Sequence, residues 1–423
     1  MSRIFLFTTI LIPPTGLPLG LYGLFKNPAQ WRKYVFCLAL ALASFAYCYI
    51  PLGAPDLVRY FQFVEETTRM SFQEVLKYGI RGESNLYIFS IVMWVIGKIG
   101  DPHLLPAIST FLVYYIGFYV TCKVGIDMEC SGKPIAWYVI FLMMALNYYS
   151  IINNVRNVLA FCLIGFAIFR DCYQKKRNVW TYILYIIPLF LHQSAISILL
   201  LRLAVQLTKK LKIVAIICVV MLKPLLGLMF PIAQGMSQSN VIISLIKNLL
   251  IKSYRYFYDT DSEWGLIVQE SGSYQLLKLI YIFAAVVVCM MAYVLSKKLF
   301  NRNMEIPSDV CDGNQGLFGK YLDFVFCLGL LTISCAPMLA PEYWRFASVM
   351  LCFSGILYFW GTKISPPRTA THYLSHCIFL IAPIGLMLWV REMQKSELYE
   401  LLVHPFFSSP IIIVIRDLAG LIF

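Results

Sequence analysis

Apolar residues dominate the chain and gather in runs of about 17 to 25 residues, which short polar segments separate. Helices of this length cross about 30 Å of hydrocarbon, and no stretch alternates as the strands of a membrane barrel do. The expected apolar segments are residues 4–25, 34–52, 86–99, 103–122, 134–151, 154–170, 179–207, 213–231, 274–296, 321–338, 346–361 and 370–390, with a weaker one at 405–421. The pattern therefore predicts an all-α fold, a polytopic integral membrane helical bundle with about 11–13 membrane segments.

The composition agrees with this fold class and excludes a soluble protein. Hydrophobic residues make up 60% of the 423 residues and charged residues only 13%, against roughly 25% charged residues in an average soluble domain. Little room is left for a separate water-soluble catalytic domain, so we expect a single transmembrane domain over residues 1–423. The N-terminal apolar segment lacks a small-residue cleavage site, so we expect a first span rather than a signal peptide.

The basic residues indicate which loops face the cytoplasm. The formal net charge of +13 comes mainly from Lys and Arg in short loops, where the positive-inside rule places them, so the charge does not indicate a nucleic-acid partner. A basic first loop at residues 26–33 makes residues 53–85 an external loop, and residues 232–273 form a second one. In the second loop, the sequence VIISLIKNLLIKSYRYFY predicts an amphipathic helix at the outer interface.

One pair of basic segments conflicts with a simple topology. Residues 170–177 and 208–212 are both basic, which favours the cytoplasm for both, yet a single apolar stretch of about 28 residues lies between them. Either this stretch, residues 179–207, is a broken re-entrant hairpin that turns near residues 188–194, or the loop at 170–177 lies outside. The hairpin also requires one nearby segment not to cross, and residues 86–99 are the shortest candidate.

Charged and polar side chains near or within apolar segments are candidate functional residues, because a bilayer makes them costly. Arg156 begins an otherwise apolar segment and follows an asparagine pair that includes Asn154. Just past the second span, Asp56, Arg59 and Tyr60 stand close together. The alternatives are interfacial snorkelling of Arg156 and a solvated Asp56–Arg59 pair three residues apart.

Two further groups lie later in the chain. His192 stands in the middle of the apolar stretch PLFLHQSAIS, where it is either a general base or a histidine that hydrogen-bonds between helices. Glu342 and Arg345 stand at the outer end of a helix beside Tyr343 and Trp344. An ion pair within the helix is the alternative for these two charges.

The residue types in these groups suit a lipid pyrophosphate-linked sugar. Arginine binds two phosphate oxygens at once through its planar donors, and aromatic rings suit the apolar faces of pyranose rings. No P-loop and no Rossmann glycine fingerprint appears, which argues against a nucleotide donor. The cysteines and histidines show no set with metal-ligand spacing, so we expect neither a metal nor another cofactor. The charge-based topology predicts that the sugar is handled at the outer leaflet.

Five short motifs occur in a characteristic order, namely PDLVRYF, ESNLYIF, NNVRNVLA, LHQSA and EYWRFA, between about residues 50 and 350. In this pattern the chain resembles the EpsG family of bacterial exopolysaccharide proteins, which is similar to the Wzy-type polymerases of O-antigen and capsule. The resemblance implies a fold similar to the GT-C glycosyltransferases with broken or re-entrant helices, in the bacterial inner membrane. It implies polymerisation of oligosaccharide repeat units carried on undecaprenyl pyrophosphate, with a flippase and a chain-length regulator as further partners.

The resemblance also implies roles for the candidate residues. Arg156 and Arg345 would bind the donor pyrophosphate with help from Arg59, and His192 or Glu342 would take the proton of the acceptor hydroxyl in an inverting displacement. The remaining substrate-binding candidates are Asp56, Tyr60, Asn154, Tyr343 and Trp344. Two alternatives remain open: a flippase or other transporter of lipid-linked sugars, and another polyprenyl-linked glycosyltransferase or ligase.

Overall fold

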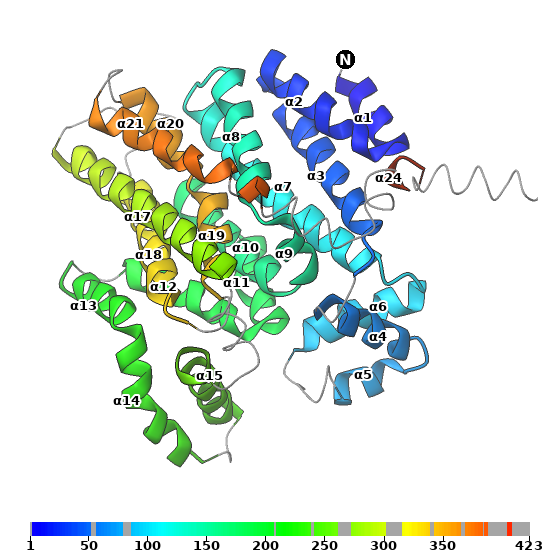
Figure 1. The fold of residues 1–423 in the computed structure, drawn as a ribbon, viewed down its shortest axis with the longest axis vertical. Coiled ribbons are helices and arrows are strands. Elements are labelled where there is room, and N and C mark those ends of the chain that lie inside the picture. The colour runs from blue at the N-terminus through cyan, green and yellow to red at the C-terminus, as the bar shows by residue number, and fades with distance from the viewer. Residues whose placement is uncertain are drawn as a thin grey trace, which may run out of the picture. The chain divides into compact units, whose positions relative to one another are not determined.

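The computed structural model describes most of the chain as helices (Figure 1). The described residues are 2–51, 56–78, 86–206, 209–237, 241–260, 272–301, 315–338, 342–364, 369–383, 385–387 and 404–407. Short 3-10 or π turns interrupt the α-helices, and no β-strand occurs among the residues of these ranges. The all-α fold class is confirmed.

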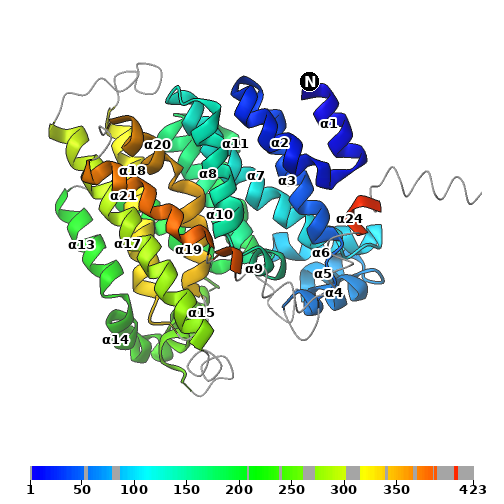
Figure 2. The same cartoon turned by 45° about the horizontal axis from the view of Figure 1, so that its top comes forward.

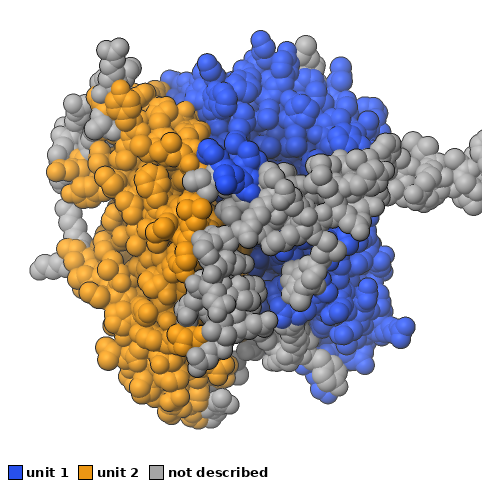
Figure 3. Space-filling view, viewed as in Figure 1, with its two compact units in different colours: residues 1–167, 182–192, 382–423 blue, residues 168–181, 193–381 orange. Residues whose placement is uncertain are grey.

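The chain divides into two compact units, which Figure 3 distinguishes by colour. Unit 1 comprises residues 1–167, 182–192 and 382–423, and unit 2 comprises residues 168–181 and 193–381. Whether the two units together form the one transmembrane domain expected over residues 1–423 stays a prediction.

The helices of unit 1 are α1 Ser2–Leu11, α2 Gly16–Lys26, α3 Trp31–Tyr47, α4 Asp56–Thr67, α5 Phe72–Tyr78, α6 Tyr87–Ile99, α7 Leu104–Asp127, α8 Gly132–Ala145, α9 Tyr148–Asn153, most of α10 Asn157–Ile168 and of α11 Val179–Leu191, and α24 His404–Phe407. The centre of this unit is the packing of α3 against α7, with α2 along α3. A methyl group at Gly16 would lie 2.3 Å from the carbonyl oxygen of Cys37. Only glycine therefore permits this close approach of α2 to α3.

The helices of unit 2 are α12 Ile196–Gln206, α13 Lys209–Val220, α14 Leu222–Gly235, α15 Val241–Tyr258, α17 Gly272–Asn301, α18 Gln315–Cys335, α19 Glu342–Phe353, α20 Gly355–Ile364 and α21 Ala370–Cys377. The two longest, α17 and α18, pack against each other, and α12, α13 and α19 pack around α18. The Tyr321 hydroxyl of α18 donates to the carbonyl oxygen of Phe353 at 3.1 Å, at the point where α19 ends.

Three of the described helices are long and apolar enough to cross a membrane by themselves: Leu104–Asp127, Gln275–Lys297 and Phe318–Cys335. The number rises to five if each of two bent helix pairs counts as one span, Leu211–Val220 with Leu222–Gly235 (84°) and Tyr343–Phe353 with Gly355–Lys363 (42°). An all-α membrane bundle is confirmed, and the bent pairs are each either a broken span or a re-entrant loop. The total of about 11–13 segments stays a prediction.

Both predicted external loops contain helices. Residues 53–85 include α4 and α5, which pack on α6, and Trp94 of α6 donates its indole N–H to the carbonyl oxygen of Met70 at 3.1 Å. Residues 232–273 include α15, which runs over the residues of the expected amphipathic helix. The external location of these segments stays a prediction.

The basic segment 170–177 is tied to α12 by an ion pair. Arg202 of α12, only 3% exposed, donates its Nε–H to Asp171 at 3.1 Å, and Arg177 donates to the same carboxylate at 2.7 Å. Burial alone would raise the pKa of Asp171, but the hydrogen bonds from Arg177 and Arg202 outweigh it and lower the pKa below its ordinary value. The carboxylate is therefore charged and fixes α12 to this segment.

These contacts bear on the path of the chain through residues 179–207. Thr181, in the first turn of α11, accepts a hydrogen bond from Arg170 at 3.1 Å, so the start of α11 lies beside the same segment that holds Arg202. From there α11 runs over its 13 residues to Leu191, about 20 Å in length. The helix break from His192 to Ala195 falls beside the predicted turn. Whether residues 179–207 re-enter or span once stays a prediction.

The re-entrant hairpin predicts that both ends of residues 179–207 lie on one side of the membrane. In a cysteine-free background, Asn178→Cys and Thr208→Cys should both react with a membrane-impermeant maleimide only when the cytoplasmic face is accessible. Lys26→Cys, in the loop with the clearest cytoplasmic charge pattern, is the matched control. Labelling of positions 178 and 208 from opposite faces would show that the stretch spans once.

Candidate functional site

The candidate site of unit 1 is built on the junction between α9 and α10. Asn147 caps α9, because its side-chain oxygen accepts the N–H of Ser150 at 3.1 Å. The helix ends after six residues, and α10 begins when the carbonyl oxygen of Arg156 accepts the N–H of Ala160 at 3.0 Å. The run NNVRN thus interrupts an apolar stretch and places Arg156 in the turn between two helices.

Neighbouring helices fix the backbone around this turn. Ser109 of α7 donates its hydroxyl to the carbonyl oxygen of Val155 at 2.7 Å, one residue before Arg156. Tyr148, at the start of α9, donates its hydroxyl to the carbonyl oxygen of Leu42 in α3 at 2.5 Å. The turn is therefore held by α3 and α7, the two helices at the centre of unit 1.

Two aromatic rings lie next to the guanidinium group of Arg156. Its Cζ atom lies 5.7 Å from the ring centre of Tyr60 in α4 and 5.7 Å from that of Phe89 in α6. The two rings contact each other edge to face, with centres 5.3 Å apart. Cation–π contacts of this kind stabilise a positive charge in a partly buried position. The Arg156 side chain is half-buried, whereas both rings are buried.

His192 lies at the end of α11 and is buried, with 5% exposure. Its ring centre lies 5.8 Å from that of Phe161 in α10, and the preceding residues of α11 contact α6 through Phe190 and Tyr87, with ring centres 6.4 Å apart. Phe161 follows Arg156 by five residues, about 7.5 Å of helix rise. Helices α6 and α10 thus connect the surroundings of Arg156 with those of His192.

Four of the five motifs therefore come together in unit 1. Tyr60 represents PDLVRYF, Phe89 represents ESNLYIF, Arg156 represents NNVRNVLA and His192 represents LHQSA. They are linked by ring and cation–π contacts. Asn154 is half-buried at the turn, where its amide donates to the carbonyl oxygen of Ser150 at 3.1 Å.

Asp56 and Arg59 form an ion pair with each other on the exposed side of α4. This is the pair at i and i+3 that the sequence left open as the alternative to a binding role. Arg59 and Tyr60 are neighbours in the chain but point about 100° apart on the helix. Tyr60 is buried toward Arg156, while Arg59 is exposed.

The motif EYWRFA lies in unit 2, at the start of α19. Glu342 is the first residue of this helix, and its side chain lies outside the described part of the structure. Tyr343 and Trp344 are buried, and the ring of Tyr343 lies 6.3 Å from that of Tyr281 in α17. The Cζ atom of Arg345 lies 5.7 Å from the ring centre of Trp344, so this arginine also stands beside an aromatic ring.

The structure adds contacts and burial that the sequence could not show. Phe89 stands within the quoted motif ESNLYIF, but only the fold shows that its ring contacts Arg156. Asn153 is 3% exposed, and its side-chain oxygen has no hydrogen-bond partner within the described residues. A buried amide oxygen of this kind calls for an explanation, and a sugar hydroxyl would supply a donor. Arg202 could have been found from the sequence, because it is a charge inside an apolar run.

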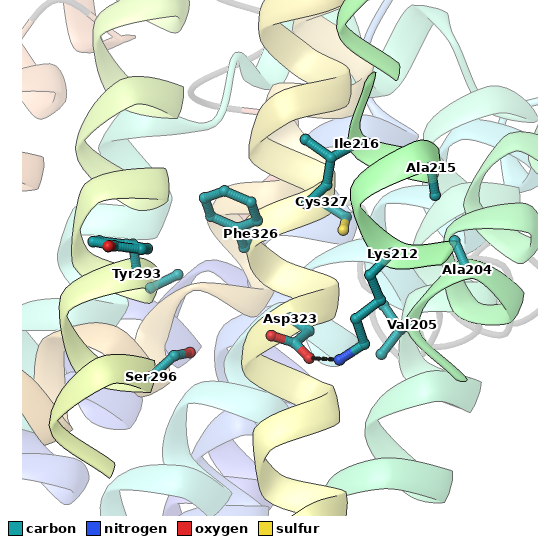
Figure 4. A pocket seen from close by; sticks show the side chains of 11 residues that line it. Ala204, Val205, Lys212, Ala215, Ile216, Tyr293, Ser296, Asp323, Phe326 and Cys327 are labelled. Atoms are coloured by element: carbon teal, nitrogen blue, oxygen red, sulfur yellow. Dashed lines mark hydrogen bonds and ion pairs between the residues drawn. The ribbon is translucent and has the colours of Figure 1, made fainter. Parts of the chain in front are cut away.

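Unit 2 contains a cavity of about 120 Å³ that holds none of the predicted site residues (Figure 4). Its walls come from four helices: Ala204 and Val205 of α12, Lys212, Ala215 and Ile216 of α13, Ala292, Tyr293 and Ser296 of α17, and Asp323, Phe326 and Cys327 of α18. The two charges in it, Lys212 and Asp323, form an ion pair with each other. The walls are otherwise mainly apolar, which does not suit a pyrophosphate or a sugar. Among the described residues, no group of three or more His, Cys, Asp or Glu side chains is placed to hold a metal ion.

The fold and these sites define a helical membrane protein that carries arginine side chains among aromatic rings. A family model described as the EpsG family matches residues 31–401, nearly the whole chain, and the chain belongs to the EpsG family. The membership suggests a role in polysaccharide biosynthesis similar to that of a polymerase. No curated protein and no solved structure matches the chain.

The contact between Arg156 and Phe89 predicts an energetic coupling between the two side chains. Phe89→Leu keeps an apolar side chain but removes the π face, and Arg156→Met removes the charge but keeps most of the length. A double-mutant cycle on the thermal stability of the solubilised protein should give a coupling of about 0.5–2 kcal/mol. Ile88→Leu with Arg156→Met is the matched control. If the stability effects of the two substitutions simply add in the Phe89 pair, as they should in the Ile88 pair, the ring of Phe89 does not stabilise Arg156.

Proposed function

We propose that the chain polymerises oligosaccharide repeat units carried on undecaprenyl pyrophosphate, at the outer leaflet of the bacterial inner membrane. The observation that carries this proposal is the position of Arg156, which a helix junction holds beside two aromatic rings in a membrane protein of the EpsG family. Lipid-linked oligosaccharide is the substrate, and a flippase and a chain-length regulator are the expected partners. No nucleotide sugar is required.

The surroundings of Arg156 suit a group that binds and releases phosphate oxygens. The two rings stabilise the guanidinium through its positive charge. The planar guanidinium can also bind two oxygens of a pyrophosphate at once. Arg345, beside the ring of Trp344 in unit 2, has the same chemistry. The resemblance assigns it the same ligand.

The proposed reaction is a single displacement at the anomeric carbon of the donor sugar. The acceptor hydroxyl oxygen forms a bond to this carbon while the bond from carbon to the pyrophosphate oxygen breaks, and the leaving pyrophosphate takes the electron pair. Arginine offsets the negative charge that grows on the leaving group. His192 or Glu342 accepts the proton of the hydroxyl. The configuration at the carbon is inverted, and no step requires a metal.

Aromatic side chains near the arginines would hold the sugars. Tyr60 lies beside Arg156, and Tyr343 and Trp344 lie beside Arg345 in sequence. Their rings suit the apolar faces of pyranoses, while the Asn153 and Asn154 amides suit the hydroxyl groups. Of the alternatives, another polyprenyl-linked transferase or ligase would use similar arginines with a different acceptor. A flippase or other transporter would instead need a polar central cavity. The mainly apolar cavity of unit 2 does not favour a passage for sugars.

The geometry of the guanidinium predicts that lysine cannot replace Arg156. Arg156→Lys keeps the charge but loses the two-pronged contact with phosphate. Polymer should be abolished or shortened severely, with a loss of about 100-fold or more in turnover of a lipid pyrophosphate-linked repeat unit. Arg69→Lys is the control, because Arg69 is exposed and has no assigned role in the site. Normal polymer from Arg156→Lys in protein that accumulates normally would contradict the proposed role.

The same reaction predicts that His192 or Glu342 is the base. His192→Gln preserves hydrogen bonding but cannot accept the proton, so it should suppress turnover by about 100-fold or more if His192 is the base. Glu342→Gln is the matched variant for the other candidate. Turnover on a purified lipid-linked repeat unit, at equal amounts of folded protein, distinguishes them. Unchanged turnover in both variants would remove both residues from the mechanism.

A further inference from the structure

Helices α14 and α15 form a two-helix hairpin, and α14 is strongly bent away from the axis of the preceding helix, α13. α13 packs against α18, one of the helices long enough to cross the membrane, and α14 follows α13 with a bend of 84° at Met221. α14 and α15 pack against each other, and Figures 1 and 2 both show them side by side at one end of unit 2. If α13 runs along the membrane normal with α18, then α14 runs nearly parallel to the membrane surface.

Aromatic rings fix the two helices to each other. The ring of Phe230 in α14 stacks on that of Tyr254 in α15, with centres 3.8 Å apart, and Tyr254 stacks on Tyr258 at 4.6 Å. The Tyr258 hydroxyl donates to the carbonyl oxygen of Lys223 at 3.0 Å, at the start of α14. At the other end, the Lys247 ammonium donates to the carbonyl oxygen of Met236 at 2.8 Å. The hairpin is therefore held at both ends.

Both helices of this hairpin expose large apolar side chains. Leu228 is 72% exposed and Ile232, one helical turn later in α14, is 63% exposed. In α15, Ile246 is also exposed. Large apolar side chains at one-turn spacing on the outside of a helix would be unfavourable in water, whereas a lipid surface accommodates them.

The hairpin carries positive charge without any negative charge. Residues 222–258 contain four basic residues and no Asp or Glu. Lys252 and Arg255, with Asn248, follow the spacing i, i+4, i+7 and so share one face of α15, nearly opposite Ile246. Within the described part of the chain, neither Lys252 nor Arg255 forms an ion pair with an acid. This face has the chemistry to bind phosphate.

We propose that the α14–α15 hairpin lies in the plane of the membrane surface and binds the headgroups of anionic phospholipids. Leu228 and Ile232 enter the acyl region, and Lys252 and Arg255 contact headgroup phosphates. The aromatic run at the end of α15, Tyr254 to Tyr258, has the composition of an interfacial belt. The joint presence of an apolar face and a cationic face favours a lipid surface over a soluble acidic partner. The proposal does not depend on the polymerase function.

The depth of the hairpin can be measured with the full chain in nanodiscs. A fluorophore on Leu228→Cys, in a cysteine-free background, should be quenched more by lipids with a spin label near the headgroup than by lipids labelled deep in the acyl chain. Ile217→Cys in α13, 53% exposed, is the matched control and should show the opposite order. Quenching of position 228 by aqueous iodide alone, or more strongly by the deep label, would overturn the interfacial position.

The headgroup preference is tested with the same labelled protein. Brominated phosphatidylglycerol should quench position 228 more strongly than brominated phosphatidylcholine at equal mole fraction. Lys252→Gln with Arg255→Gln should reduce this preference by roughly fivefold for each charge lost, whereas Lys252→Arg with Arg255→Lys should keep it. An unchanged preference in the glutamine variant would refute the cationic contact. If inorganic pyrophosphate abolishes the preference for phosphatidylglycerol, the face with Lys252 and Arg255 binds a pyrophosphate ligand instead.

Discussion

The cost of burying a charge among apolar side chains is the constraint on which the rest of the structure depends. Within the described residues, Arg202 pairs with the mostly buried Asp171, and Lys212 pairs with Asp323, each about one-third exposed. Arg156 stands beside aromatic rings. A buried pair fixes two helices to each other and neutralises its own charge, whereas rings stabilise a cation without neutralising it.

A second feature of the structure is that the candidate functional residues lie where apolar helices are interrupted. Arg156 stands in the turn between α9 and α10, and His192 stands between α11 and the 3-10 turn that precedes α12. A continuous helix satisfies its own backbone in lipid and leaves little polar surface for a substrate. At a break, side chains and backbone groups turn toward the protein interior. Asn147, which caps α9, therefore contributes to the site although it lies well before Arg156 in the chain.

The sequence predicts the features that depend on local pattern. Long apolar runs predict the helical membrane class, and the five motifs predict the family. The break at His192 falls in the part of residues 179–207 where the re-entrant alternative places its turn. The sequence could not show that Tyr60 is buried toward Arg156 while its neighbour Arg59 is exposed, because the choice depends on the packing of α4 against α6. The ring of Phe89 was missed for the same reason: contacts between distant segments leave no local signal.

The ring environment of Arg156 has a consequence for turnover. The proposed polymerisation requires the site to bind a lipid pyrophosphate tightly enough to activate it and then to release the lipid product after every cycle. Two rings contribute about 0.5–2 kcal/mol each whether the phosphate is bound or absent. They hold the arginine in position without competing for its ligand, which suits repeated binding and release.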